Sequence, residues 1–253
     1  MCGIIGIIGS EDNGGVAGRI IEGLRRLEYR GYDSAGLATL VNGNIDRRRA
    51  EGKLINLASR LKEEPLAGDV GIGHTRWATH GIPNEINAHP HATSTVALVH
   101  NGIIENFKEL KAELVDRGAN FASETDTEVV VHLISQYLKN GLDPVVAAET
   151  ALKRLEGAFA LAMIFSGEHN LMVGARRGSP LVVGYGNDEM FLGSDAIALA
   201  PWTNRICYLD EGDWVIVHRD GAEIHEASGD VVQRKIKLTA NSLGDISKGN
   251  YRH

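Results

Sequence analysis

The sequence predicts an α+β fold in which two antiparallel sheets pack against each other and helices cover them. Before residue 155, several segments carry apolar residues at helical spacing. Short apolar runs separated by glycine, serine and asparagine then follow at 158–165, 170–175, 180–185 and 189–193. Glycine is also frequent, with 30 residues in 253. Tight turns favour antiparallel pairing, and the apolar face of a sheet must be buried against another layer.

Helices are expected mainly in the first part of the chain. Apolar residues recur after Val16 at spacings of four, four and three, which predicts an amphipathic helix over 14–28. The same periodicity predicts helices over 54–62, 107–118 and 126–139. A further helix begins at Asp143-Pro144, which supplies an N-cap and a proline for the first turn.

Strands are expected in both halves of the chain. The apolar runs predict further strands over 34–41, 70–74, 95–100, 206–209, 214–218 and 223–225. The dipeptides Asn42-Gly43 and Asp220-Gly221 predict tight turns, and 195–199 predicts one helical turn. The last residues are polar and aperiodic, so we expect one domain over 1–240 and the start of a linker over 241–253.

Composition narrows the class of protein. The formal net charge of −7 argues against nucleic acid or an anionic membrane as the main partner. No apolar run approaches the roughly 20 residues of a membrane helix, and the first residues lack the basic region of a signal peptide. Only Cys2 and Cys207 are present, too few for a disulfide framework. These features predict a cytoplasmic protein.

The first candidate for chemistry is Cys2, which follows Met1 and opens an apolar, β-branched run. If Met1 is removed, Cys2 carries a thiol and a free α-amine, so nucleophile and base lie on one residue. Free groups of these kinds titrate at about 8.5 and about 7.7–8.0, which makes proton exchange between them easy near neutral pH. The alternative is a cysteine that acts as a small buried apolar residue.

A second candidate is the segment 74–81, His-Thr-Arg-Trp-Ala-Thr-His-Gly. Arg76 could bind a carboxylate through its guanidinium group, and Trp77 could cover the ligand and exclude water. The alternative is a structural arginine paired with a nearby acid, next to a tryptophan that fills the core.

The third candidate is Asn101-Gly102, which lies between apolar runs. Asn-Gly in this setting predicts a tight hairpin turn. The functional alternative is an oxyanion hole, because the Asn101 carboxamide and the Gly102 N–H are both hydrogen-bond donors. A turn could serve both purposes.

The fourth candidate is the segment 123–128, Ser-Glu-Thr-Asp-Thr-Glu. Thr125 and Glu128 fit a capping box, and Asp126 is suited to cap the following helix. As the functional alternative, the Asp126 carboxylate could bind a ligand ammonium group. Together with Arg76 it would then recognise both ends of a free α-amino acid.

Histidines form the last candidate group. His74, His80, His89, His91 and His100 fall within 27 residues, which allows a metal-dependent hydrolase as a rival hypothesis. Their spacing, however, matches none of the established zinc motifs, and histidines near turns are usually hydrogen-bonded structural residues.

These segments together resemble one known family. Cys2-Gly3-Ile4, 27–36 (Leu-Glu-Tyr-Arg-Gly-Tyr-Asp-Ser-Ala-Gly), 74–81, 87–91 (Asn-Ala-His-Pro-His), 100–106 and 123–128 occur in this order. The chain resembles the glutaminase domain of the glutamine–fructose-6-phosphate aminotransferases, or glucosamine-6-phosphate synthases, over essentially all of its length. The N-terminal cysteine is common to class II glutamine amidotransferases, whereas segments 28–36 and 74–81 are more specific.

The resemblance implies the N-terminal nucleophile hydrolase fold, a four-layer α/β/β/α sandwich of two antiparallel sheets. It makes Cys2 the nucleophile and its α-amine the base. It assigns Arg76 to the glutamine α-carboxylate, Asp126 to the α-ammonium group, and Asn101 with Gly102 to the oxyanion hole. Trp77, Thr79 and His80 belong to the loop that closes over glutamine, and Arg30 lies near Cys2 in a supporting place.

The reaction expected from this resemblance is hydrolysis of L-glutamine to glutamate and ammonia through a Cys2 thioester, with no metal or organic cofactor. In the full-length enzyme the ammonia converts fructose 6-phosphate to glucosamine 6-phosphate. The partners implied are a C-terminal isomerase domain of the same polypeptide and a homodimeric arrangement. The rivals are the metal-dependent hydrolase and a non-catalytic amino-acid-binding module, which a retained Met1 would favour.

Overall fold

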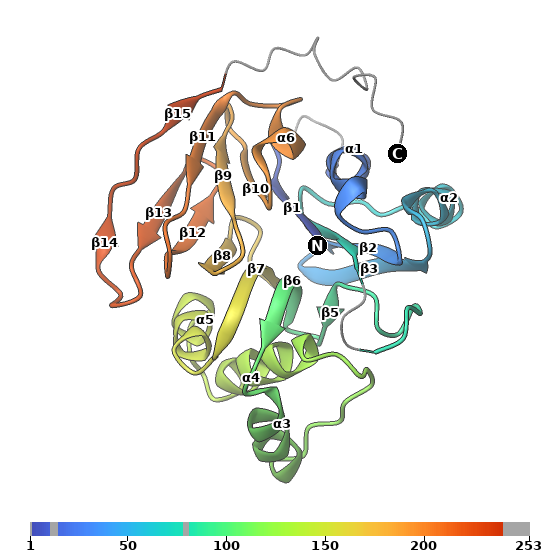
Figure 1. Cartoon of the computed structure of the whole chain (residues 1–253), viewed down its shortest axis with the longest axis vertical. Helices are drawn as coiled ribbons and strands as arrows, with labels where there is room; N and C mark the ends of the chain where they lie inside the picture. The colour runs from blue at the N-terminus through green and yellow to red at the C-terminus, as the bar shows by residue number, and fades with distance from the viewer. Residues whose placement is uncertain (1, 11–14, 78–80, 240–253) are drawn as a thin grey trace.

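The computed structural model describes residues 2–10, 15–77 and 81–239, and in these ranges it has two antiparallel sheets flanked by helices (Figure 1). The eight-stranded sheet has the order β15-β11-β9-β10-β1-β4-β2-β3. Its strands are β1 (Gly3–Ile8), β2 (Ser34–Val41), β3 (Asn44–Glu51), β4 (Val70–Arg76), β9 (Val182–Tyr185), β10 (Met190–Gly193), β11 (Arg205–Tyr208) and β15 (Lys237–Leu238).

The seven-stranded sheet has the order β14-β13-β12-β8-β7-β6-β5. Its strands are β5 (His91–Ala92), β6 (Val96–Ile104), β7 (Gly157–Phe165), β8 (Met172–Arg177), β12 (Trp214–His218), β13 (Gly221–His225) and β14 (Val231–Val232). The helices are α1 (Ala17–Leu27), η2 (Glu28–Arg30), α2 (Leu54–Glu63), α3 (Phe107–Asp116), α4 (Thr127–Lys139), α5 (Pro144–Leu152) and α6 (Ala196–Leu199).

Three apolar clusters define the layers of the molecule. One cluster lies between the sheets, where Ile4 and Ile8 of β1 meet Ala97 and Val99 of β6. A second cluster joins the eight-stranded sheet to α1, α2 and α6, and a third joins the seven-stranded sheet to α3, α4 and α5. Side chains alternate between the two faces of a strand, so one strand contributes both to the cluster between the sheets and to the cluster under the helices. The predicted α/β/β/α sandwich is therefore confirmed.

Strand β1 lies in the middle of its sheet, paired with β10 on one side and β4 on the other. All six of its residues are buried, which agrees with the apolar run after Cys2. Because Gly3 pairs with Thr75, Cys2 lies just beyond the paired region, next to the end of β4. The fold thus brings the candidate nucleophile to the end of the central strands β1 and β4 without burying it fully.

The predicted turn at Asn101-Gly102 is wrong. Both residues lie inside the continuous strand β6, where Asn101 pairs with Ala160 and Gly102 with Phe159 of β7. Gly102 has φ of +123°, and a Cβ there would lie 2.0 Å from the carbonyl oxygen of Ala158. The glycine is needed for this local distortion of the strand and not for a chain reversal.

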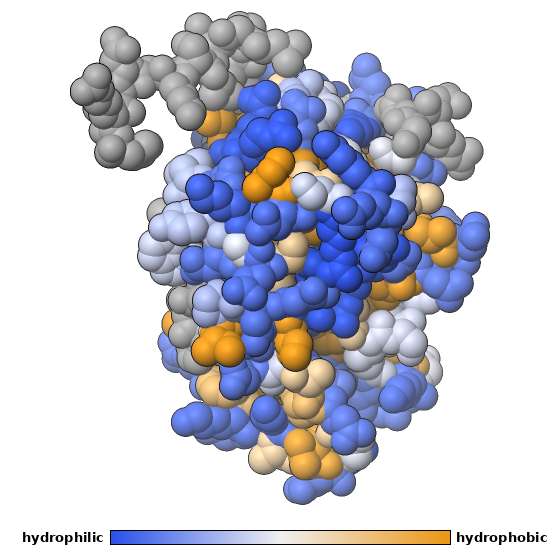
Figure 2. All heavy atoms as spheres, turned by 90° about the vertical axis from the view of Figure 1, so that its right-hand side faces the viewer, coloured by the Kyte–Doolittle hydropathy of each residue, from blue (hydrophilic) through white to orange (hydrophobic). Residues whose placement is uncertain are grey.

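Strand β3 forms an edge of the eight-stranded sheet and carries Arg47, Arg48 and Arg49. Charged side chains on an edge strand oppose pairing with another chain. Arg47 donates to the carbonyl of Pro90 at 3.1 Å, and Arg49 donates to that of Ala88 at 3.0 Å, so this edge also holds the segment that precedes β5. Figure 2 shows this side of the molecule, where hydrophilic residues dominate and apolar residues form small separate groups.

The other predicted helices and strands agree with the structure to within a few residues, whereas no strand was predicted at β3, β5, β14 or β15. Asn42 and Gly43 both have positive φ, 51° and 78°, as the predicted tight turn between β2 and β3 requires. The Asp143 side chain accepts a hydrogen bond from the Val145 N–H and caps α5 as predicted. Among the described helices, none has the length and apolar character needed to cross a membrane.

Candidate active site

A small cavity opens where the start of β1, the end of β4, the middle of β6 and the start of α4 meet. The side chains and backbone that line it come from Cys2, Arg76, Trp77, His89, His100, Gly102, Thr125, Asp126 and Thr127. Five of the predicted site residues are therefore brought together from segments far apart in the sequence, namely Cys2, Arg76, Trp77, Gly102 and Asp126.

The Cys2 thiol is held by the backbone of Trp77. The Trp77 N–H donates to Cys2 Sγ at 3.2 Å, and Sγ lies 3.5 Å from the Trp77 carbonyl oxygen. Burial raises the pKa of the thiol, and nearby Asp33 raises it further, while the Trp77 N–H and the Arg76 charge act in the opposite direction. Because the net shift is upward, the resting group is a thiol, and a base is needed to make it a nucleophile.

Arg76 is the last residue of β4 and is only 4% exposed. Its guanidinium group lies 3.5 Å from the carbonyl oxygens of both Gly81 and Ile82. Burial lowers the pKa of Arg76, and the Asp126 carboxylate opposes this shift. The guanidinium group is therefore cationic within a cavity shared with Asp126 and Cys2. This arrangement supplies a fixed positive charge for an anionic ligand group.

Trp77 differs from Arg76 in being 46% exposed. Its ring meets Tyr32 edge to face, with 5.8 Å between the ring centroids. Gly31, just before Tyr32, has no room for a side chain, because a Cβ would lie 2.8 Å from the backbone nitrogen of Trp77. The segment 28–36 therefore packs directly against the backbone that holds the thiol.

Asn101 extends from β6 toward the start of β1. Its Nδ2 donates to the carbonyl oxygen of Cys2 at 3.1 Å, and its Oδ1 lies 3.0 Å from His74 Nε2. The carboxamide is thus beside the backbone of the candidate nucleophile, although Asn101 is not among the described residues that line the cavity. The Gly102 backbone follows directly and lines the same cavity.

Asp126 does not cap α4 with its side chain, in contrast to the capping prediction. No side-chain cap hydrogen bond is present, and Oδ2 instead accepts from the Ile104 N–H at 2.7 Å. Asp126 is 4% exposed and its carboxylate faces the end of β6. The negative charge is therefore held beside the cavity by a strand, opposite the positive charge of Arg76.

The predicted capping box of Thr125 and Glu128 is also wrong. Glu128 accepts hydrogen bonds from the backbone N–H groups of Ala122 and Ser123, at 2.9 and 2.7 Å. Thr125 Oγ1 bonds to Ser123 Oγ and to His91 Nε2 instead of the helix. Through these two hydrogen bonds, Glu128 of α4 fixes the backbone of the segment that precedes Asp126.

The described histidines of the candidate group form a buried cluster. His89 stacks on His74 with 4.3 Å between centroids and meets His91 edge to face at 4.9 Å. Burial lowers the pKa of His74 and of His91 to about 3 each, and that of His89 well below its usual value, so these rings are neutral. Within the part of the chain that the structure describes, no histidine, cysteine and carboxylate group has an arrangement that could hold a metal ion. The geometry of the described residues therefore does not favour the metal-dependent hydrolase.

A family model for a glutamine amidotransferase domain matches residues 74–201, which is half of the chain. The chain belongs to the glutamine amidotransferase domain family. The match includes Arg76, Asn101, Gly102 and Asp126. It excludes Cys2, which the fold brings into one cavity with Arg76, Gly102 and Asp126.

Curated relatives of high sequence identity carry a longer name. Over all 253 residues, the chain is 62% identical to a glutamine–fructose-6-phosphate aminotransferase (isomerizing) of Mesorhizobium japonicum. It is 58% identical to proteins of the same name from Brucella abortus and Zymomonas mobilis. In each case it spans 41% of the relative's length.

Solved structures of other proteins share the fold. The glutamine phosphoribosylpyrophosphate amidotransferase of B. subtilis, complexed with ADP and GMP, matches with a TM-score of 0.77 and 24% identity, over 91% of this chain and 50% of that one. A structure described as the allosteric regulatory enzyme of purine biosynthesis matches with a TM-score of 0.76 and 26% identity, over the same shares. Both support the two-sheet sandwich.

Other predicted site residues of the amidotransferase domain fall elsewhere. Arg30, in η2, forms an ion pair with Asp195 at 2.6 Å and a hydrogen bond to Tyr29 at 3.0 Å. It is not among the described residues that line the Cys2 cavity. Thr79 and His80 lie outside the described residues.

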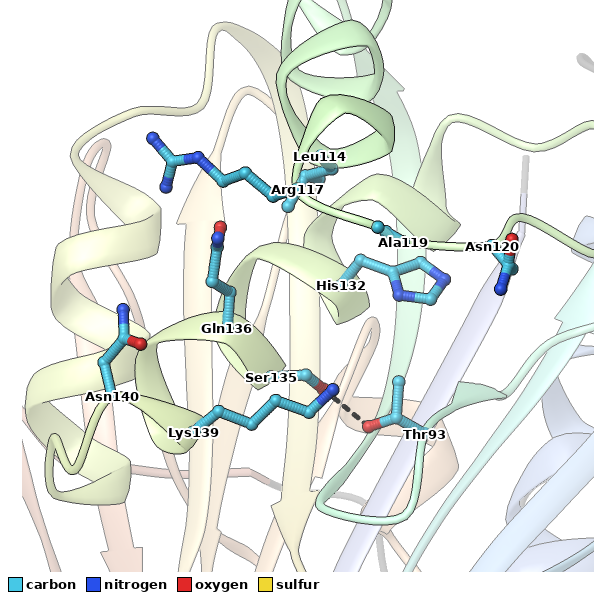
Figure 3. A pocket seen from close by; sticks show the side chains of 11 residues that line it. Thr93, Leu114, Arg117, Ala119, Asn120, His132, Ser135, Gln136, Lys139 and Asn140 are labelled. Carbon is cyan, nitrogen blue, oxygen red and sulfur yellow. Dashed lines mark hydrogen bonds between the residues drawn. The ribbon is translucent and has the colours of Figure 1, made fainter.

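A larger cavity of 490 Å³ lies between α3 and α4 of the amidotransferase domain (Figure 3). Its cations Arg117 and Lys139 stand at the C-terminal ends of these helices, where positive charge offsets the helix dipole. Arg117 also pairs with Glu113 at 2.9 Å. This cavity does not contain Cys2, so its size alone does not make it the reactive site.

Burial alone would raise the pKa of Glu128, but the His132 contact and the hydrogen bonds from Ala122 and Ser123 lower it from 4.5 to about 2. A folded-state pKa below the unfolded one stabilises the domain above about pH 4.5, and this contribution is lost as the pH falls toward 2. Glu128→Gln is expected to lower the free energy of unfolding by about 3 kcal/mol at pH 7 and by about half of that at pH 3.

Urea unfolding at the two pH values measures this difference. The exposed pair Glu149–Lys153 gives a matched control, because Glu149→Gln should cost less than about 1 kcal/mol at either pH. An equal loss for Glu128→Gln at pH 7 and pH 3 would contradict the assigned ionisation.

Sequence reasoning missed the hydrogen-bond partners behind the site. The favoured interpretation of His74, His89, His91 and His100 as hydrogen-bonded structural residues is confirmed, but the sequence did not show that their partners are Asn101, Thr125 and Thr127. Ser194, whose hydroxyl accepts from the Ile4 N–H at 3.0 Å beside β1, also had no recognisable signal. These roles depend on contacts between distant segments.

Proposed function

We propose that this chain hydrolyses L-glutamine to L-glutamate and ammonia, with Cys2 as the nucleophile. The observation that supports it most directly is the composition of one cavity, which joins the Cys2 thiol, the Arg76 cation and the Asp126 anion. A thiol flanked by one charge of each sign matches a free α-amino acid whose side chain carries the reacting group. Membership of the glutamine amidotransferase family supports glutamine as that amino acid.

Substrate recognition uses the two charges separately. The Arg76 guanidinium group binds the α-carboxylate, and the Asp126 carboxylate binds the α-ammonium group, each through charge-assisted hydrogen bonds. Trp77, together with Thr79 and His80, covers the bound glutamine and reduces the access of water. The side chain of glutamine then extends toward Cys2 Sγ.

The reaction begins once Met1 has been removed, so that Cys2 has a free α-amine. The amine takes the thiol proton, and the thiolate forms a bond to the side-chain amide carbon of glutamine. The negative charge that develops on the amide oxygen is stabilised by donors from Asn101 and Gly102. The C–N bond then breaks as the protonated amine gives its proton to the leaving nitrogen, which departs as ammonia.

The second half of the reaction regenerates the thiol. The γ-glutamyl thioester on Cys2 is attacked by water, which loses a proton to the same α-amine. The C–S bond breaks, the thiolate takes the proton back, and glutamate is released. One glutamine and one water are thus converted to glutamate and ammonia without a metal or an organic cofactor.

The whole protein is proposed to use this ammonia for synthesis. The similar relatives are named glutamine–fructose-6-phosphate aminotransferases (isomerizing), and this chain spans only 41% of their length. We assign residues 1–240 to the glutaminase domain and 241–253 to the start of a linker. An isomerase domain beyond the linker would receive the ammonia and convert fructose 6-phosphate to glucosamine 6-phosphate, in a cytoplasmic and homodimeric enzyme.

Intact-protein mass spectrometry with 6-diazo-5-oxo-L-norleucine, a reactive glutamine analogue, tests the proposal. The expected result is loss of Met1 and one adduct that maps to Cys2 and is prevented by excess glutamine. Cys207, which is buried in the core between the sheets, is the internal control and should stay unmodified. Glutamine binding without an adduct or turnover would instead support a binding module.

A further inference from the structure

His74 joins the two sheets beside the candidate nucleophile. It lies in β4, where it pairs with Ile4 of β1, and its side chain is fully buried. Asn101 lies in β6 of the other sheet. The contact of 3.0 Å between His74 Nε2 and Asn101 Oδ1 therefore crosses the gap between the sheets at the level of the cavity.

The hydrogen positions in this contact follow from its partners. The carbonyl oxygen of Cys2 can only accept, so the Asn101 atom 3.1 Å from it must be the NH₂ group. The other end of the carboxamide, which faces His74, is then the oxygen, and it can only accept as well. His74 Nε2 must therefore carry a proton and donate.

We propose that His74 is a positioning residue for glutamine hydrolysis, whose Nε2–H orients the Asn101 carboxamide so that its NH₂ group points toward Cys2 and the oxyanion. This inference rests on the proposed function, because it assigns a role in the same reaction. The new element is that Asn101, a proposed oxyanion-hole donor on one sheet, is oriented by His74 on the other sheet. Without the histidine, the carboxamide can rotate and present its oxygen to the developing negative charge.

The chemistry of the site explains why a neutral histidine suits this place. Burial lowers the pKa of His74 to about 3, so the ring stays neutral and its single N–H remains available at all working pH values. The other ring nitrogen, Nδ1, is buried and has no hydrogen-bond partner among the described residues. Because a buried polar atom without a partner is unfavourable, packing alone does not account for an imidazole here.

Two substitutions test the orientation. His74→Leu removes the donor, and kcat for glutamine hydrolysis is expected to fall about 10²-fold, as for loss of an oxyanion-hole donor. The KM for glutamine should change by less than about threefold, since Arg76 and Asp126 bind the substrate. His74→Gln keeps an NH₂ donor near the Nε2 position and should recover most of the lost kcat.

A double-mutant cycle separates positioning from general damage. In an Asn101→Ala background, His74→Leu should cause little further loss of kcat, because the group that His74 orients is already absent. Fully additive losses, or equal losses for His74→Leu and His74→Gln, would overturn the inference. Thermal unfolding of each variant checks the fold. His225→Leu is the matched control, because this buried histidine lies in β13, far along the sheet from β6, and should leave kcat unchanged.

A readout that needs no turnover separates this inference from the proposed function. Nitrogen-15 spectra of the His74 ring should show a proton on Nε2 and none on Nδ1, and Asn101→Ala should expose that proton to faster exchange. A proton on Nδ1 would overturn the inference even in an active enzyme. Absence of glutaminase activity with the expected tautomer would contradict the proposed function alone.

Discussion

Replacing Cys2 by alanine is expected to lower kcat for glutamine hydrolysis by at least about 10⁴-fold, because loss of a nucleophile removes covalent catalysis as a whole. The thiol contacts the Trp77 backbone and no described core cluster, so the variant should fold normally. The measurement is the rate at which the chain, after removal of Met1, forms glutamate and ammonia from saturating glutamine.

Two comparisons make the Cys2→Ala result specific. Calorimetry should show glutamine binding to the variant with an affinity within a few-fold of the KM, since Arg76 and Asp126 are unchanged. Cys207→Ala should leave turnover intact, because Cys207 lies in the core between the sheets. Substantial residual turnover in Cys2→Ala would remove Cys2 as the nucleophile.

Replacing Asp126 by asparagine is expected to weaken the affinity for both glutamine and glutamate by at least about 30-fold. This corresponds to about 2 kcal/mol, the lower end of the range for losing one member of a buried charge pair. Asparagine has nearly the same shape and keeps an oxygen that can accept from the Ile104 N–H, so the loss measures the charge and not the fold. Calorimetric titration in the Cys2→Ala background gives the affinities without turnover.

Two further variants distinguish substrate binding by Asp126 from a structural role. Asp126→Ala also removes the acceptor for Ile104 and should lower the free energy of unfolding, whereas Asp126→Asn should not lower it substantially. Asp143→Asn alters the aspartate that caps α5, away from the cavity, and should leave both affinities unchanged. If Asp126→Asn left the affinities for glutamine and glutamate unchanged, the role of Asp126 would be only structural, at the end of β6.

The dipeptide Asn-Gly occurs in two strand contexts, and only one of them forms the predicted turn. Asn42 and Gly43 both adopt positive φ and connect β2 to β3. At Asn101-Gly102 only the glycine has positive φ, and the strand continues because all nine residues of β6 pair with β7. Local propensity is the same at both places, so long-range pairing decided between turn and strand.

Helix caps show the same division. Asp143 caps α5 as predicted, because no other donor competes for its carboxylate in the described structure. Asp126 has the same position before α4, but the Ile104 N–H at the end of β6 takes its carboxylate. A cap is a local interaction and can be predicted from sequence until a distant strand supplies a partner.

The sequence by itself determined the α+β class, the extent of most helices and strands, and the candidate residues Cys2, Arg76, Asn101, Gly102 and Asp126. It could do so because hydrophobic periodicity and the chemistry of residue types are local properties. Only the tertiary structure decided which way these groups face. The neutral His74, the rotation of the Asn101 carboxamide and the attachment of Asp126 to β6 all depend on contacts between segments that meet only when the two sheets pack together.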